Sequence, residues 1–215
     1  VLFFVAVSVA GRGGSGRAGR FAAVGTAAWM ALAGALAYAG VLADFDARPP
    51  PMAFLFLGTF AIGMVVGLSR VGASLARAFP LWALVLVQGF RFPLELLMHE
   101  AAAEGTMPDA MTWTGWNYDV LTGLTALVVA PLLFAGAPRA LAWAWNVLGI
   151  LTLAGITVVA FLASPMVGAF GPDQRNTWVT TFPFVWLPTV LVASAVAGHV
   201  IVTRRLLAEG RAARK

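Results

Sequence analysis

The chain has 215 residues, of which 60% are hydrophobic and only 11% are charged. Water-soluble domains carry about 25% charged residues, so much of this protein's surface has to face lipid. Six membrane spans would use roughly 120 positions and leave only short pieces outside the bilayer. This composition excludes a cytosolic enzyme, a nucleic-acid-binding domain and a single-pass receptor. We therefore expect an all-α, polytopic membrane helix bundle.

The residue types that the sequence lacks narrow the chemistry further. It has no cysteine, which excludes iron–sulfur clusters, thioether-attached haem and thiolate catalysis. The only lysine is Lys215, so a retinal Schiff base within the membrane is excluded. Its two histidines are too few for a histidine-rich metal cluster, although a haem on His199 alone stays open. The sequence thus implies no cofactor and no metal, and without a hydrolase or phosphate-loop motif it favours a protein that is not an enzyme.

Six apolar runs bounded by charged residues predict six transmembrane helices. They cover residues 21–43, 52–69, 80–99, 118–137, 140–163 and 182–203. Short connections separate them, so a single domain over 21–203 with a basic tail at 204–215 is the simplest organisation. The segment 1–20 fits less well, because its apolar start spans about half a bilayer and precedes the basic stretch. We expect a truncated or mis-started N-terminus there, with an interfacial helix as the alternative.

The distribution of charge predicts the orientation of this bundle. Basic residues of the termini and of two connections fall on one side: Arg12, Arg17, Arg20, Arg70, Arg77, Arg139, Arg204, Arg205, Arg211, Arg214 and Lys215. By the positive-inside rule this side is cytoplasmic, and both termini are predicted to lie there. Most acidic residues fall on the other side. Topology therefore accounts for the net charge of +5 with the lipid bilayer as the partner and no nucleic acid.

The third predicted span carries ionisable residues, which are costly in lipid and point to function. Arg91, Glu95 and His99 recur every four residues and line one helix face. Gln88 lies one turn before Arg91. In one interpretation Arg91 and Glu95 neutralise each other as a structural pair. In the other, this face lines an outward-facing polar pocket, in which Arg91 binds an anion and Glu95 carries a proton.

A second polar cluster, WTGWNYDVLTGLTA (113–126), begins the fourth predicted span. Asn117 or Asp119 can cap this helix, because a side-chain oxygen accepts hydrogen bonds from its first amides. The alternative is that both residues lie beside the polar face of the third span and close the outer mouth of the pocket. Thr122 and Thr125 would then extend the pocket inward. Their oxygens could hold a hard cation, but no spacing here is diagnostic of one.

Three smaller features complete the predictions. The loop GPDQRN predicts a lid over the pocket or an ordinary solvated turn, formed by Asp173, Gln174, Arg175 and Asn176. On the inner side, Asn146 and His199 predict a mutual hydrogen bond. Gly63 and Gly67 form G-x-x-x-G, and the first span is rich in Ala and Gly. Both patterns favour close helix packing or a homo-oligomer.

Together these motifs resemble an uncharacterised family of small bacterial multi-pass membrane proteins. The likeness covers roughly residues 40–205 and rests on QGFRFPLELLMH, WTGWNYDVLTGLTA, Trp145-Asn146, DQRN and FPFVWLP followed by His199. The resemblance implies an integral protein of the bacterial inner membrane and carries over no activity. Beside Gly115, where the family has an acidic residue and an arginine, this chain has Thr114 and Trp116.

Three classes of function are open at this point. In the expected one, the polar pocket binds or transports an ion, a small anion or a lipid headgroup. In the second, the protein is an enzyme acting on a lipid-linked substrate, with Glu95 or Asp119 as general base and Arg91 holding a phosphate or carboxylate. In the third, it is a structural or assembly subunit of a membrane complex, and the polar residues only pack.

Overall fold

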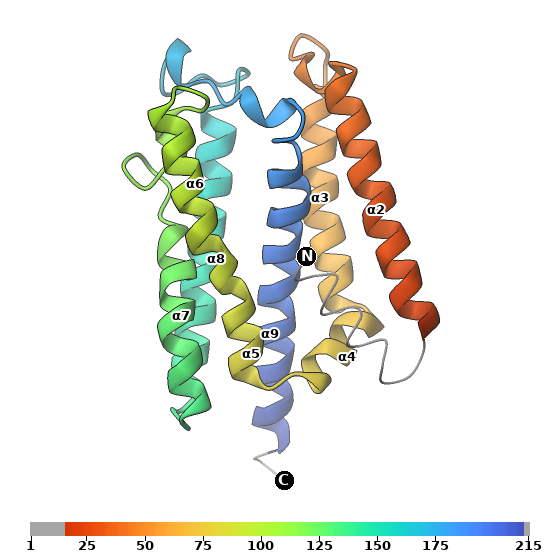
Figure 1. The fold of residues 1–215 in the computed structure, drawn as a ribbon, viewed down its shortest axis with the longest axis vertical. Coiled ribbons are helices and arrows are strands. Elements are labelled where there is room, and N and C mark those ends of the chain that lie inside the picture. Colours follow the sequence, from red (N-terminus) through yellow and green to blue (C-terminus); the bar gives the residue numbers. More distant parts are fainter. Residues whose placement is uncertain (1–15, 213–215) are drawn as a thin grey trace. The chain divides into compact units, whose positions relative to one another are not determined.

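The computed structural model describes residues 16–212, and this part of the chain consists of helices without any strand. Its α-helices are α2 (Gly16–Tyr38), α3 (Pro51–Leu68), α4 (Arg70–Ala78), α5 (Leu81–Val87), α6 (Arg91–Ala103), α7 (Val120–Phe134), α8 (Arg139–Leu162) and α9 (Ala193–Ala212) (Figure 1). The all-α prediction is confirmed for these residues. The expectations for the start of the N-terminal segment, residues 1–15, and for the last three residues lie outside the described part.

Four of the described helices are long and apolar enough to cross a membrane, whereas the sequence predicted six. They are Pro51–Leu68, Leu81–Ala103, Arg139–Leu162 and Leu187–Ala212. The first predicted span falls in α2, of which Ala23–Tyr38 is the apolar part, and the fourth corresponds to the shorter helix Val120–Phe134. Each ends early at a glycine in the left-handed conformation, Gly40 (φ 72°) and Gly136 (φ 94°). Such a glycine stops the helix and lets the following amides satisfy its last carbonyls.

Two local features differ from the predicted pattern. Residues 70–79, expected as a connection, form α4, and the hydroxyl of Ser69 caps this helix by accepting from two of its first amides. The third span is not uniformly α-helical, because the turn Gln88–Phe90 between α5 and α6 is a 3-10 helix. Pro93 has no amide hydrogen for the carbonyl one turn earlier, which explains the change of helix type there.

The chain divides into two compact units, Val1–Pro80 with Val179–Lys215 (unit 1) and Leu81–Trp178 (unit 2). In unit 1, α3 lies directly against α9 at two glycines. A Cβ on Gly63 would come within 2.8 Å of the Ala193 carbonyl oxygen, and one on Gly67 within 2.7 Å of the Val200 side chain. The G-x-x-x-G motif therefore serves close packing inside this unit. A homo-oligomer through the same two glycines would have to displace α9.

Indole hydrogen bonds hold α2 in the same unit. Trp29 Nε1 donates to the Thr189 carbonyl over 3.0 Å, and Trp186 Nε1 donates to the Met30 carbonyl over 3.0 Å. Thr189 belongs to a π-helical stretch, Leu187–Val192, that leads into α9. Beside these bonds lies an apolar core formed by Ala33, Ala37, Leu42, Leu55 and Val185.

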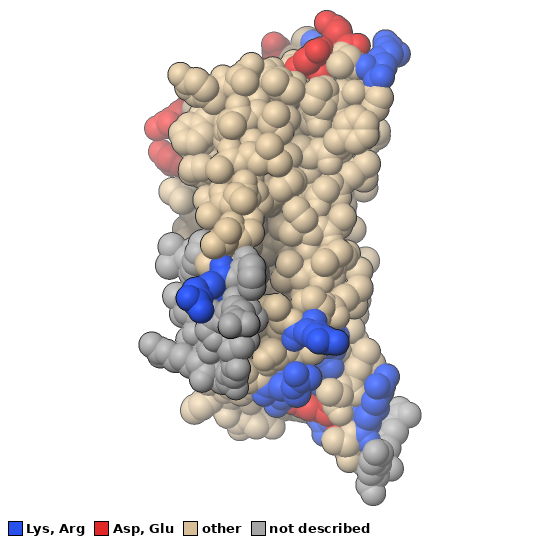
Figure 2. All heavy atoms as spheres, turned by 90° about the vertical axis from the view of Figure 1, so that its right-hand side faces the viewer, with Lys and Arg blue, Asp and Glu red and all other residues tan. Residues whose placement is uncertain are grey.

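Basic residues gather where α3 and α4 meet the last turns of α9. Arg204 Nη1 donates to the carbonyls of Gly67 (2.7 Å) and Ser69 (2.9 Å), and Arg205 Nη1 donates to the carbonyl of Ala76 (3.1 Å). On the face shown in Figure 2, Lys and Arg lie mainly toward one end and Asp and Glu toward the other, with uncharged surface between. This separation of charge is the one expected from the sequence; the cytoplasmic side stays a prediction.

In unit 2, α7 packs directly on the α5–α6 segment. A Cβ on Gly123 would overlap the backbone nitrogen of Phe92, and one on Gly89 would come within 2.8 Å of the Leu127 side chain. Asp119 precedes Gly123 by one helical turn, and Phe92 follows Arg91 directly. This backbone contact therefore brings the start of α7 level with the start of α6, and so positions the polar residues of the two helices together.

Candidate functional site

Arg91 and Asp119 form a buried ion pair. Arg91 is the first residue of α6, Asp119 directly precedes α7, and Arg91 Nε lies 3.2 Å from Asp119 Oδ2. Their side chains are 2% and 9% exposed. The four-residue spacing of Arg91 and Glu95 had suggested that these two form the pair. Asp119 takes this position because the close approach at Gly123 aims it across the helix interface, whereas Glu95 projects from the next turn of Arg91's own helix.

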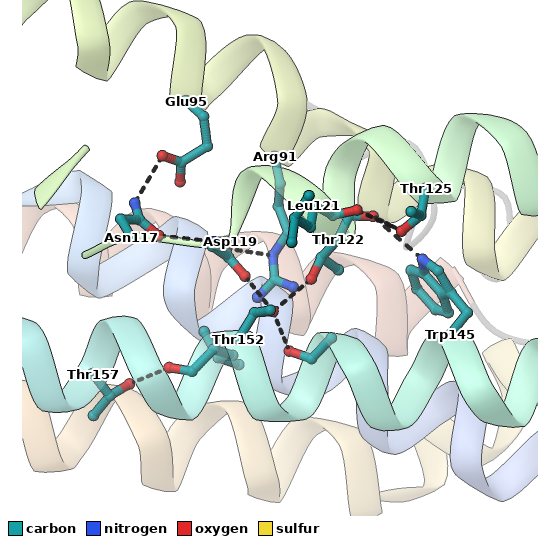
Figure 3. A network of polar contacts seen from close by, with 12 residues as sticks. Arg91, Glu95, Asn117, Asp119, Leu121, Thr122, Thr125, Trp145, Thr152 and Thr157 are labelled. Atoms are coloured by element: carbon teal, nitrogen blue, oxygen red, sulfur yellow. Dashed lines mark hydrogen bonds and ion pairs between the residues drawn. The ribbon is translucent and has the colours of Figure 1, made fainter. Parts of the chain in front are cut away.

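Glu95 is bonded instead to Asn117, as Figure 3 shows. Asn117 Nδ2 donates to Glu95 Oε2 over 2.7 Å and to the Met111 carbonyl over 3.0 Å. Asn117 Oδ1 accepts from the Asp119 amide over 2.9 Å. Asp119 stands at the N-cap of α7 but makes no side-chain cap hydrogen bond, so its predicted capping role is wrong. The carboxylate points to Arg91 and α8 instead.

Two threonines complete the network: Thr122, which was expected to extend the pocket inward, and Thr152, which the sequence did not single out. Thr152 Oγ1, on α8, donates to Asp119 Oδ1 over 3.0 Å and lies 2.6 Å from Thr122 Oγ1 on α7. Trp145 Nε1 donates to the Thr122 carbonyl over 3.3 Å. Thr125, expected to extend the pocket, bonds to the Leu121 carbonyl of its own helix. The sequence offered one indication that Thr152 belongs to the site, a hydroxyl group within an apolar run. Such hydroxyl groups often form hydrogen bonds between helices in lipid.

We call Arg91, Glu95, Asn117, Asp119, Thr122 and Thr152 the carboxyl cluster. It contains two carboxyl groups and one guanidinium, and all three groups are buried. If both carboxyl groups are ionised, a negative charge is left over; if one carries a proton, the cluster is neutral. Burying an uncompensated charge is far more costly than burying a neutral set. The cluster is therefore suited to taking up one proton or one cation, and it is poorly suited to a further anion.

Three of the four carboxyl oxygens in the cluster already face a hydrogen-bond or ion-pair donor. Arg91 and Thr152 face the two oxygens of Asp119, and Asn117 donates to Glu95 Oε2. In residues 16–212, no group of three or more histidine, aspartate or glutamate side chains is arranged to hold a metal ion. A hard cation such as Ca²⁺ takes about six to eight oxygen ligands, whereas a proton needs a single oxygen. The donor set therefore favours a proton.

The other residues of the predicted pocket do not all join the cluster. Gln88 is buried in the 3-10 turn before α6. His99 is half-buried at the far end of α6, where its ring stacks on Trp113 with centroids 4.3 Å apart and planes inclined by 24°. The stack on Trp113 accounts for the position of the His99 ring, and a role of His99 in the pocket stays a prediction.

The predicted lid is attached to the connection between α6 and α7. Gln174 Oε1 accepts from the Ala110 amide over 3.0 Å, and the Asn176 amide donates to the Ala163 carbonyl over 2.8 Å. Asn176 is buried, whereas the other two members of the group, Asp173 and Arg175, are exposed. The loop is thus a turn docked by its polar residues, and movement over a pocket stays a prediction.

The predicted inner pair falls on different units. Asn146 lies on α8 of unit 2 and is 1% exposed, whereas His199 lies on α9 of unit 1 and is 2% exposed. Both side chains are buried, and a hydrogen bond between them stays a prediction.

Comparison with protein families places the chain in one of them. A family model described as "Domain of unknown function (DUF8737)" matches residues 49–207, which is most of the sequence, so the chain belongs to this family. The match includes the whole carboxyl cluster. Comparison with curated proteins and with solved structures gives no match.

Proposed function

We propose that this chain is an integral protein of a bacterial inner membrane that takes up and releases a proton at Glu95. The membrane assignment is supported by its four long apolar helices and by the separation of charge along them. With the two shorter apolar helices the chain would cross the bilayer six times. An even number of spans returns both termini to the basic, cytoplasmic side.

The observation that carries the proposal is the excess of buried carboxyl groups over guanidinium groups in unit 2. Arg91 already faces Asp119 at 3.2 Å, so the two form a neutral pair. Glu95, 3% exposed, is the carboxyl whose bonding partner Asn117 is uncharged. Intramembrane carboxyl groups of this kind mark ion and proton pathways. Among the ligands that the sequence left open, a proton fits this arrangement, whereas a bound anion does not.

The direct test is proton flux into liposomes that contain the purified protein and a trapped pH-sensitive dye. We expect Glu95→Gln to lower the flux to about a hundredth of the wild-type value, the loss typical of removing a proton-transfer group. Glu100→Gln is the matched control, because Glu100 lies on the same helix and is exposed. It should leave the flux unchanged. A folded Glu95→Gln variant with wild-type flux would refute the proposal.

The Arg91–Asp119 pair also favours a second candidate function, a structural subunit of a membrane complex. The pair fixes α6 to α7, and a buried pair can serve register alone. In that case the wild-type protein would show no proton flux, and it would co-purify with a larger assembly. No contact among residues 16–212 specifically favours the remaining class of function, an enzyme acting on a lipid-linked substrate.

A further inference from the structure

The two carboxyl groups of the cluster differ in the donors that face them. Asp119 faces the charged Arg91 Nε at one oxygen and the Thr152 hydroxyl at the other. Glu95 receives the neutral amide of Asn117 at one oxygen. Hydrogen bonds to a carboxylate favour its ionised form. Both carboxyl groups are buried in the same cluster, so this difference in donors governs which of them holds a shared proton.

The direction of the hydroxyl bonds follows from their distances. Thr152 Oγ1 lies 3.0 Å from Asp119 Oδ1 and 3.2 Å from the Gly149 carbonyl of its own helix. The carboxylate is both nearer and charged, so it is the stronger acceptor for the single hydroxyl proton. Thr122 Oγ1, 2.6 Å away, then donates to the free lone pair of Thr152. The two hydroxyls form a short chain of donors that ends on Asp119.

We propose that Thr152 determines which carboxyl of the cluster carries the exchangeable proton: its hydroxyl keeps Asp119 ionised, so the proton resides on Glu95. This inference rests on the proposed function and identifies the residue that regulates it. Thr152 acts through Asp119 and is therefore a positioning residue.

The charged surroundings of the cluster in unit 2 are few. Arg91 and Glu95 come from α6, and Asp119 precedes α7. Neither α7 nor the part of α8 beyond Arg139 contains an ionisable side chain. In unit 2, α8 therefore acts on the carboxyl groups through the uncharged hydroxyl of Thr152, which donates to Asp119. Without its hydroxyl, Arg91 and the weaker contribution of the Thr122 hydroxyl would be left to favour ionised Asp119 over ionised Glu95.

Infrared spectroscopy of the reconstituted protein tests this assignment, because a protonated carboxyl has its own C=O band. In the wild type we expect a band that Glu95→Gln removes. In Thr152→Val, the ratio of protonated Asp119 to protonated Glu95 should rise by about tenfold to a hundredfold, the worth of a hydrogen bond to a charged group. A second carboxyl band should appear, and adding Asp119→Asn should remove it. Thr152→Ala, which cannot clash, should do the same if the valine variant does not fold.

Two further variants separate this role from a packing role. Thr152→Ser keeps the hydroxyl and should restore the wild-type spectrum. Thr157→Val is the matched control, because Thr157 is half-buried on the same helix and its hydroxyl bonds only to the Leu153 carbonyl one turn earlier, over 2.7 Å. It should leave the spectrum unchanged.

The outcomes distinguish the two proposals. Proton flux that depends on Glu95, together with a wild-type spectrum in folded Thr152→Val or Thr152→Ala, would overturn the role of Thr152 alone. A wild-type protein without any band or flux that depends on Glu95 would overturn the proposed function and this inference with it. A second band that survives Asp119→Asn would also contradict the assignment.

Discussion

The helices of the two units are held together by different means. In unit 1, α3 meets α9 at two glycines, and the contact consists of backbone and small apolar side chains. In unit 2, α6 meets α7 at Gly123, but an ion pair and a hydrogen-bond network lie next to that contact. Glycine contacts suffice to pack apolar helices closely. The charged groups of unit 2 are therefore not needed for close approach as such, which is why we look for function there.

The two kinds of contact are therefore sensitive to opposite kinds of substitution. A glycine contact fails when a side chain is added, because there is no space for a Cβ. A charge network fails when a side chain is removed, because the partner stays buried with an uncompensated charge. Three substitutions test the contrast, and hydrogen exchange by helix can assign each effect to its unit.

The largest effect should come from Asp119→Ala in unit 2. It leaves Arg91 buried without its ion-pair partner, and breaking one side of a buried pair costs about 3–5 kcal/mol. Unfolding in detergent should show this loss, and exchange should rise in α6 and α7. Asp173→Ala, at an exposed acid of the same unit, should stay within about 0.5 kcal/mol of wild type. A loss below about 1 kcal/mol in Asp119→Ala would mean that the pair does not hold this unit together.

An intermediate effect should come from Gly67→Ala in unit 1. The added Cβ would lie 2.7 Å from the Val200 side chain, so α3 and α9 have to separate, at a cost of about 1–3 kcal/mol for overpacking. Gly25→Ala is the control, because nothing lies within 4 Å of a Cβ at that helical position. It should be neutral or slightly stabilising, since alanine favours helices. Equal behaviour of the two variants would show that α3 and α9 are not in close contact.

The smallest effect should come from Arg204→Gln, which removes a charged donor from the carbonyls of Gly67 and Ser69. These carbonyls end α3, and we expect a loss of about 1–2 kcal/mol in the same unfolding measurement. Arg211→Gln, at an exposed arginine of the same helix, should change stability by less than about 0.5 kcal/mol. If both variants behave alike, the basic end of unit 1 contributes through net charge and not through capping.

Much of the carboxyl cluster could be predicted from helical spacing and from the cost of charge in lipid. These two arguments identified Arg91, Glu95, Asn117 and Asp119 as candidates, and one of the two interpretations placed Asn117 beside Glu95. Which of these residues bond to one another was harder to predict from the sequence. A spacing of four residues suggests a bond between Arg91 and Glu95, but it contains no information on what the neighbouring helix presents at the same height.

The threonines show the same limit in a simpler form. Thr152 and Thr157 lie on one helix, each in an apolar run, and no local pattern separates them. Thr152 bonds to Asp119 across the helix interface, whereas Thr157 bonds to its own backbone. The rotation of α8 against α7 determines which hydroxyl meets a carboxylate.

The composition and order of residues were enough to establish the helical class, the apolar segments and the few polar residues that lie among them, because hydrophobicity and helical period are local properties. They placed the C-terminal ends of the first and fourth helices too late in the chain, since the turn at a left-handed glycine depends on where the chain has to reverse. The partner of each buried charge was determined by the packing of α6, α7 and α8. Such pairing joins residues that are distant in sequence, and it follows from how closely the backbones approach at Gly123.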